Sequence, residues 1–231
     1  VAIATAALPP LSRSSAQTDY TEFRHTLAHS LALVFLLCIP SAVGLAVLGR
    51  PIVAVIFEHG NSTAFDTVQT GNALAPSAIG LAGYAAVKVL SPAFYALGDA
   101  RTPMLISLGS IAVNYVMNFL LVRPFGHVGL AFSTSTVALV NFILLAFLMR
   151  RRVGPLKGNH LGTTLARICL ASIPMAAAAW LGSEFCGRLP LAGIALKLVR
   201  VSASVTLAAI VFYAGCRLLR IKELDEASEA I

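Results

Sequence analysis

The sequence predicts an all-α membrane protein, a polytopic bundle of transmembrane helices, and three observations support this fold class. Hydrophobic residues make up 58% of the 231 residues, and the mean hydropathy is +0.83. Charged residues make up only 12%, whereas a soluble domain usually has about 25%. Short polar segments separate apolar stretches that are each near the ~20 residues needed to cross a bilayer. These predicted spans run roughly over 29–48, 64–90, 103–122, 127–149, 161–182 and 191–216.

Residues 1–28 precede the first complete span. Residues 1–8 are apolar but too short to cross a hydrocarbon core, which predicts the end of a truncated transmembrane helix. In residues 17–29, Tyr20, Phe23 and Leu27 recur at helical spacing. This amphipathic pattern favours a cytoplasmic linker helix on the membrane surface. A helical linker that simply continues into the next span is the alternative.

Residues 50–60 separate the first two spans. The apolar run that follows Arg50 and Pro51 is too short to cross the membrane, so it predicts an interfacial helix that ends at Gly60. Thr63 and Asp66 then form a capping-box pattern at the start of the second span.

The end of the second span carries two hinge candidates. Pro92 is predicted to bend or end the helix, because proline lacks an N–H and its ring clashes with the preceding turn. Gly98 opens a polar turn, after which Thr102 and Pro103 restart a helix. The candidates are therefore Pro92 and Gly98.

The basic residues are divided unevenly between the two sets of loops. On one side the loops hold ten Lys and Arg residues, including those of the basic loop 150–160 and the tail 217–231, and the opposite loops hold three. Cytoplasmic loops usually carry the excess, so the C-terminus is predicted to be cytoplasmic. The net charge of +7 is thereby explained as topology, not nucleic-acid binding. The predicted organisation is four transmembrane helices over 29–149 and two more over 161–216.

Polar residues inside the spans are the candidates for substrate contacts, because burying them without partners costs several kcal/mol. They are predicted either to line a hydrated cavity or to form hydrogen bonds between helices. Lys88 could equally extend to the lipid headgroups, and for Arg167, Lys197 and Arg200, which lie near span ends, this extension is the favoured interpretation. The cavity candidates are Lys88, on one helical face with Ser77, Gly80, Tyr84 and Ser91; Asn114 and Asn118, at i and i+4 after Ser110; and Asn141, which shares a face with Thr134.

No enzymatic constellation is evident in the sequence. The four cysteines lack metal-ligand spacing, and the histidines do not form a metalloprotease motif. Neither a serine nucleophile motif nor a phosphate-binding glycine loop is present. We therefore predict no catalytic residue, no metal and no cofactor.

Four stretches of the sequence, in order, resemble the MurJ/MviN lipid II flippases. They are IPSAVGL (39–45) with RPIV (50–53); FEHG (57–60) with FD (65–66); VKVLSPAFYALGDARTP (87–103); and GHVGLA (126–131). This family belongs to the multidrug/oligosaccharidyl-lipid/polysaccharide exporter superfamily. The resemblance implies a MATE-like exporter fold, in which this chain is the second lobe plus two extra C-terminal helices that form a lipid-facing groove.

The same resemblance implies a function and a set of partners. The protein would translocate lipid II, the undecaprenyl-diphosphate-linked peptidoglycan precursor, across the bacterial inner membrane. Its partners would be lipid II or a similar polyprenyl-diphosphate-linked saccharide, membrane lipids and the missing N-terminal lobe of the same protein. The main substrate-binding arginines would precede Val1, so the fragment alone would be inactive. The alternatives are a flippase for another polyprenyl-linked saccharide, a drug/cation antiporter of the same superfamily, a non-transporting scaffold for cell-wall enzymes, and an intramembrane enzyme.

Overall fold

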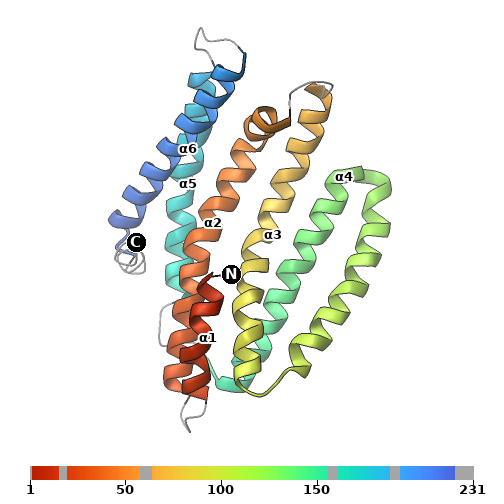
Figure 1. Cartoon of the computed structure of the whole chain (residues 1–231), viewed down its shortest axis with the longest axis vertical. Helices are drawn as coiled ribbons and strands as arrows, with labels where there is room; N and C mark the ends of the chain where they lie inside the picture. Colours follow the sequence, from red (N-terminus) through yellow and green to blue (C-terminus); the bar gives the residue numbers. More distant parts are fainter. Residues whose placement is uncertain (1, 16–19, 58–63, 156–160, 188–192, 222–231) are drawn as a thin grey trace.

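The computed structural model confirms an all-helical membrane protein. It describes residues 2–15, 20–57, 64–155, 161–187 and 193–221. Five helices in this described part are long and apolar enough to cross a membrane. The helices lie side by side and run up and down the bundle (Figure 1). They are α1 (Ala2–Ser15), α2 (Thr21–Phe57), α3 (Ala64–Ala96), α4 (Arg101–Val153), α5 (Leu161–Cys186) and α6 (Gly193–Leu218).

Helix α2 is the element against which most of the others pack. It contacts α1, α3, α5 and α6, while α4 packs against α3 (Figure 1). The hairpin of α5 and α6 therefore joins the rest of the bundle through α2. With 37 residues, α2 is about 55 Å long, which exceeds the ~30 Å hydrocarbon core even at a steep tilt.

The long helix α4 is two antiparallel arms joined at Gly126. Gly126 has φ 53° and ψ −130°, which breaks the helix, and Figure 1 shows the chain reversing direction there. At Gly129, an added Cβ would lie 2.4 Å from the Leu121 carbonyl oxygen, so glycine permits the arms to approach. The first arm (101–125) and the second arm (127–153) coincide with the third and fourth predicted spans.

The amphipathic segment before the first span is part of α2. Residues 21–29 continue into the span without a break, and Phe23 and Leu27 are buried inside the protein. The Tyr20 and Phe23 rings pack edge to face, with centroids 6.3 Å apart. The prediction of a helix on the membrane surface is therefore wrong, and the alternative of a continuous linker is correct. The apolar stripe correctly indicated a face that avoids water, but it could not show whether lipid or protein covers that face.

The predicted interfacial helix after Arg50 is also continuous with α2, which extends to Phe57 with Pro51 inside it. Figure 1 shows this last part of α2 tilted away from the rest of the helix, as a proline inside a helix favours. The predicted helix end at Gly60 and the predicted cap at Thr63 lie outside the described residues.

Helix α3 does not end at Pro92, contrary to one of the two predicted outcomes, but continues to Ala96. Proline removes only the hydrogen bond that its N–H would donate to the Lys88 carbonyl, and the neighbouring residues keep the helix intact. The helix ends at Gly98, which has φ 73°. The Gly98 N–H donates to the Tyr95 carbonyl and the Asp99 N–H to the Phe94 carbonyl, both at 3.0 Å. This pair of bonds is a Schellman cap.

The two ends of the bundle differ in packing. We call the end with the α3–α4 turn and the last residue of α4 the Asp99 end, and the opposite end, with the C-terminus of α2 and the N-terminus of α6, the Arg50 end. The larger apolar core extends to the Asp99 end and includes Phe94, Met149 and Ile168. A smaller cluster lies toward the Arg50 end and consists of Leu48, Met175, Ala179 and Ala208.

Candidate functional site

Lys88 borders a cavity of about 260 Å³ between α1, α2 and α3. Ile3, Cys38 and Tyr84 line the same cavity, and Lys88 and Tyr84 are both exposed. Lys88 lies two turns before the end of α3 at Ala96, about 12 Å along the helix axis. Within the part of the chain that the structure describes, no ion pair engages Lys88. This placement agrees with the cavity interpretation of Lys88.

The predicted polar face of α3 has two separate roles in the structure. Ser77, Tyr84 and Lys88 are exposed, whereas Gly80 is buried against the second arm of α4. A Cβ on Gly80 would lie 2.7 Å from Ser135, so glycine is needed for this close approach. Gly80 thus allows α3 to pack closely against α4, while the larger polar side chains of α3 stay exposed.

Asn114 and Asn118 lie on the half-buried face of the first arm of α4, while Tyr115 and Phe119 on its other faces are exposed. The Asn118 side-chain amide donates a hydrogen bond of 2.9 Å to Asn114 Oδ1. Asn118 Oδ1 is buried and has no hydrogen-bond partner among the described residues. A buried acceptor of this kind costs about 1–3 kcal/mol until a donor reaches it.

Some polar residues on the second arm of α4 form hydrogen bonds between helices, and others are left available for a cavity. Ser135 Oγ donates to the Pro76 carbonyl at 2.7 Å, which is the predicted hydrogen bond between helices. In contrast, Asn141 Oδ1 and Ser133 Oγ are buried without a partner in the described part of the chain. The α4 hairpin thus holds three unpaired polar atoms, and we keep Asn114, Asn118 and Asn141 as predicted contacts for a polar substrate.

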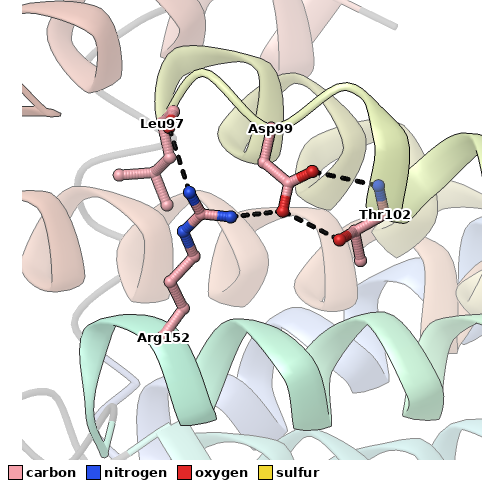
Figure 2. A network of polar contacts seen from close by, with 4 residues as sticks. All are labelled: Leu97, Asp99, Thr102 and Arg152. Carbon is pink, nitrogen blue, oxygen red and sulfur yellow. Dashed lines mark hydrogen bonds and ion pairs between the residues drawn. The ribbon is translucent and has the colours of Figure 1, made fainter.

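The turn between α3 and α4 is closed by Asp99 (Figure 2). Asp99 Oδ1 accepts the Thr102 N–H at 3.0 Å, and Oδ2 accepts the Thr102 hydroxyl at 2.8 Å. Arg152, near the end of α4, forms an ion pair with the same carboxylate and donates to the Leu97 carbonyl at 3.4 Å. The Thr102 hydrogen bonds, together with the Arg152 charge, hold the pKa of Asp99 below its ordinary value. The hinge roles of Pro92 and Gly98, beside this closed turn, stay predictions.

A further polar cavity, which the sequence did not predict, lies at the Arg50 end. It has a volume of about 690 Å³ and is lined by residues of α2, α3, α5 and α6. Arg50 donates to Asn72 Oδ1 from Nε at 3.2 Å and from Nη2 at 2.9 Å. Arg200 Nε donates to Ser183 Oγ at 2.8 Å. Arg200 therefore reaches across to α5 instead of simply extending to the headgroups as predicted.

The sequence held only a weak signal for this cavity. Trp180, Ser183 and Glu184 fall at i, i+3 and i+4 near the end of α5, so they share one helical face. Arg50 is far from these residues in the sequence, and no spacing rule connects them. Only the packing of α2 beside α5 and α6 brings the two arginines to one cavity.

Comparisons with known proteins agree with this helical arrangement. Residues 1–199 match the family model described as "Lipid II flippase MurJ". The chain is 36% identical over 152 residues to the lipid II flippase MurJ of Burkholderia cenocepacia, covering 66% of this chain and 30% of that protein. It is 28% identical over 219 residues to the probable lipid II flippase MurJ of Synechocystis sp., covering 94% of this chain and 41% of that protein.

A solved structure has the same fold. It is titled "Lipid II flippase MurJ, inward closed conformation" and superimposes with a TM-score of 0.72 at 24% sequence identity, covering 95% of this chain and 43% of that chain. The chain thus spans well under half the length of the relatives that it matches.

Proposed function

Because this chain belongs to the lipid II flippase MurJ family, we propose that it forms the C-terminal part of a flippase of the bacterial inner membrane. The cargo is lipid II, an anionic diphosphate-sugar-peptide headgroup on a polyprenyl tail. In this proposal the chain supplies the second lobe and two extra helices, α5 and α6. An N-terminal lobe of the same protein completes the cavity, and the two lobes alternate access between the two sides. The protein moves its cargo without a catalytic residue or cofactor.

The observation that carries this proposal beyond family membership is the position of Lys88. An ammonium group that faces a cavity within a membrane helix adds positive potential where an anionic headgroup must pass. Lys88 is exposed, and no ion pair within the described residues neutralises it. Its cavity opens beside α1, the helix that the resemblance assigns to the N-terminal continuation of the lobe.

The orientation with the C-terminus in the cytoplasm is also part of the proposal. Figure 1 places the ends of α1 and α4 at the same end of the bundle, and α6 runs toward that end. Their terminal turns carry Arg13, Arg150, Arg151, Arg152 and Arg217. A concentration of arginines at one end supports placing that end in the cytoplasm. Lys88 would then lie closer to the side on which lipid II is made.

The test is a pair of substitutions at Lys88 in the complete native protein. We expect Lys88→Ala to weaken lipid II binding by about tenfold, because one charge-assisted contact is lost. Lys88→Arg retains the charge and should keep most of the binding. Both variants are compared at equal membrane abundance, by binding of purified lipid II and by rescue of cells depleted of their own flippase.

Arg150→Ala is the matched control, since it removes an exposed positive charge near the same end of the bundle. Equal binding and rescue by the Ala and Arg variants of Lys88 would exclude Lys88 from the cargo path. Full rescue by a protein that binds no lipid II would favour a scaffold function instead. Tighter binding of another polyprenyl-linked saccharide than of lipid II would reassign the cargo.

A further inference from the structure

Two arginines from different helices, Arg50 of α2 and Arg200 of α6, line the cavity at the Arg50 end. Gly71 on α3 lies directly against Arg50, and a Cβ added at Gly71 would come within 2.9 Å of Arg50 Cγ. The absence of a side chain at Gly71 therefore allows Arg50 to lie across α3 and reach Asn72. Arg200 enters the same cavity from α6 and is held by Ser183, a serine that is only 5% exposed.

Both arginines keep unused hydrogen-bond donors. The partners of Arg50 and Arg200 in the described residues, Asn72 and Ser183, are neutral side chains. These contacts use Nε of both groups and Nη2 of Arg50. The remaining N–H groups are available to a ligand. Glu184 also lines the cavity, so two positive charges and one negative charge leave it net positive.

An apolar groove of about 300 Å³ is lined by three of the four helices that line this polar cavity, α2, α5 and α6. Leu48 and Ile52 of α2 line the groove, whereas Val47 and Pro51, in the same two turns, line the polar cavity. Along α6 the groove begins at Val205, about 8 Å from Arg200 on the side of the bilayer centre. A cationic cavity near the helix ends and an apolar groove farther along the same helices thus lie on neighbouring faces of α2.

We propose that the Arg50–Arg200 cavity binds the phosphodiester headgroup of an anionic phospholipid, whose acyl chain occupies the apolar groove. Guanidinium groups bind phosphate oxygens through paired, charge-assisted hydrogen bonds. The cavity lies near the ends of the membrane helices, where lipid headgroups are within reach. Trp180, which lines the cavity and is 59% exposed, has the amphipathic ring that is common at this depth.

The apolar groove distinguishes a lipid from a free anion as the occupant. Inorganic phosphate would use the two arginines and leave the exposed groove residues Val205 and Ala209 without a partner. A phospholipid satisfies both surfaces at once, because its charge and its apolar chain are joined. This site is separate from the Lys88 cavity, which lies among α1, α2 and α3, so it does not depend on the proposed cargo.

Trp180 supplies the probe, because it is the only tryptophan in the sequence. We would reconstitute the complete native protein, with any tryptophan outside this sequence replaced by phenylalanine, in nanodiscs of phosphatidylcholine with increasing amounts of phosphatidylglycerol that carries a brominated acyl chain. Bromine quenches nearby indole fluorescence, so binding of the brominated lipid lowers the fluorescence intensity of Trp180. Brominated phosphatidylcholine measures contact with bulk lipid, and a parallel series with inorganic phosphate and unbrominated lipid tests whether a free anion displaces the probe.

We expect saturable quenching at a low fraction of phosphatidylglycerol, and a requirement for about tenfold more of it in Arg50→Gln or Arg200→Gln. Gly71→Ala should weaken binding without a change in charge, because the new methyl group displaces Arg50. Arg123→Gln is the matched control. It removes an exposed arginine at the same end of the bundle, where Arg123 stacks on the Phe119 ring 5.5 Å away, and it should bind normally.

Each of the other outcomes would overturn the assignment. Equal quenching by the two brominated lipids would mean that Trp180 senses only bulk lipid. Loss of affinity in Arg123→Gln as large as in the cavity variants would indicate general surface charge. Reversal of the quenching by millimolar inorganic phosphate would assign the cavity to free anions. If Gly71→Ala and Arg50→Gln, each tested alone, both bound phosphatidylglycerol with normal affinity, Arg50 would not belong to the site.

Discussion

The two ends of the helical bundle differ in the partners of their charged side chains. At the Asp99 end, the carboxylate of the α3–α4 turn pairs with a guanidinium near the end of α4, and large apolar residues fill the space between the helices. At the Arg50 end, two guanidinium groups are held by neutral side chains around a cavity of about 690 Å³. One end is thus closed by its own residues, and the other leaves binding capacity for a ligand.

This difference originates in the residues that face each other across the helices. Phe94, Met149 and Ile168 are fully buried at or near the Asp99 end. The corresponding positions near the Arg50 end include small residues such as Gly71, Ala75 and Ala54, which line the cavity. Small residues bring helix backbones close but fill little volume beside them, so a long arginine has room to enter.

The largest expected effect is a loss of stability on removing one buried ring at the Asp99 end. Phe94 is 1% exposed, so Phe94→Ala should lower the free energy of unfolding by about 3–5 kcal/mol. Trp180→Ala at the other end removes a larger ring that is 59% exposed, and it should cost less than about 1 kcal/mol. Thermal unfolding in the same detergent compares the two, and similar losses would contradict the difference between the ends.

A smaller effect is expected from the glycine that ends α3. Gly98 has φ 73° and no atoms within 4 Å of an added Cβ, so Gly98→Ala should cost about 1–2 kcal/mol through backbone strain alone. Gly109→Ala is the control, because its added Cβ also meets open space but its φ is not positive. That substitution should be neutral or stabilising by up to about 1 kcal/mol. Equal effects of the two changes would show that the cap at Gly98 does not depend on glycine.

The smallest effect concerns pH and Asp99. Its pKa is lowered in the folded protein by the Thr102 hydrogen bonds and by Arg152. Its contribution to stability is therefore complete above the unfolded pKa of roughly 3.9 and is lost as the pH falls through the lower folded pKa. The stability difference between the wild type and Asp99→Asn should be constant above about pH 5 and shrink below about pH 4. A difference that grows on acidification would reverse the assigned sign.

The sequence predicted the fold well because a bilayer restricts the structures that a chain can adopt. Each span needs about twenty apolar residues, so the lengths and the order of the helices followed from hydropathy. The reversal near Gly126 was also predicted, since the spans 103–122 and 127–149 left a short loop between them. Helix ends were predicted less well. Pro92 was expected to bend or end α3, but a single missing hydrogen bond does not stop a helix whose neighbours remain packed.

Sites were predicted only where the signal is local. Lys88 was chosen as a candidate because a charge within an apolar span is conspicuous by itself, and its role stays a prediction. Asn114 and Asn118 were identified by their spacing, and the structure adds the hydrogen bond between them. The Arg50–Arg200 cavity was missed because it depends on how distant helices pack. Phe23 was predicted to face the membrane but is buried in the protein, because the same apolar stripe can pack against either lipid or protein.

The most direct test of the difference between the two ends uses two alanines on the same helix. Ala75 lines the cavity at the Arg50 end, and Ala93 is 0% exposed near the Asp99 end. Each is changed to cysteine after Cys38, Cys169, Cys186 and Cys216, which are free thiols, have been replaced. We predict that a water-soluble maleimide modifies Ala75→Cys about 100-fold faster than Ala93→Cys, because only the latter needs local unfolding. Equal rates at the two positions would contradict a closed Asp99 end and an open Arg50 end.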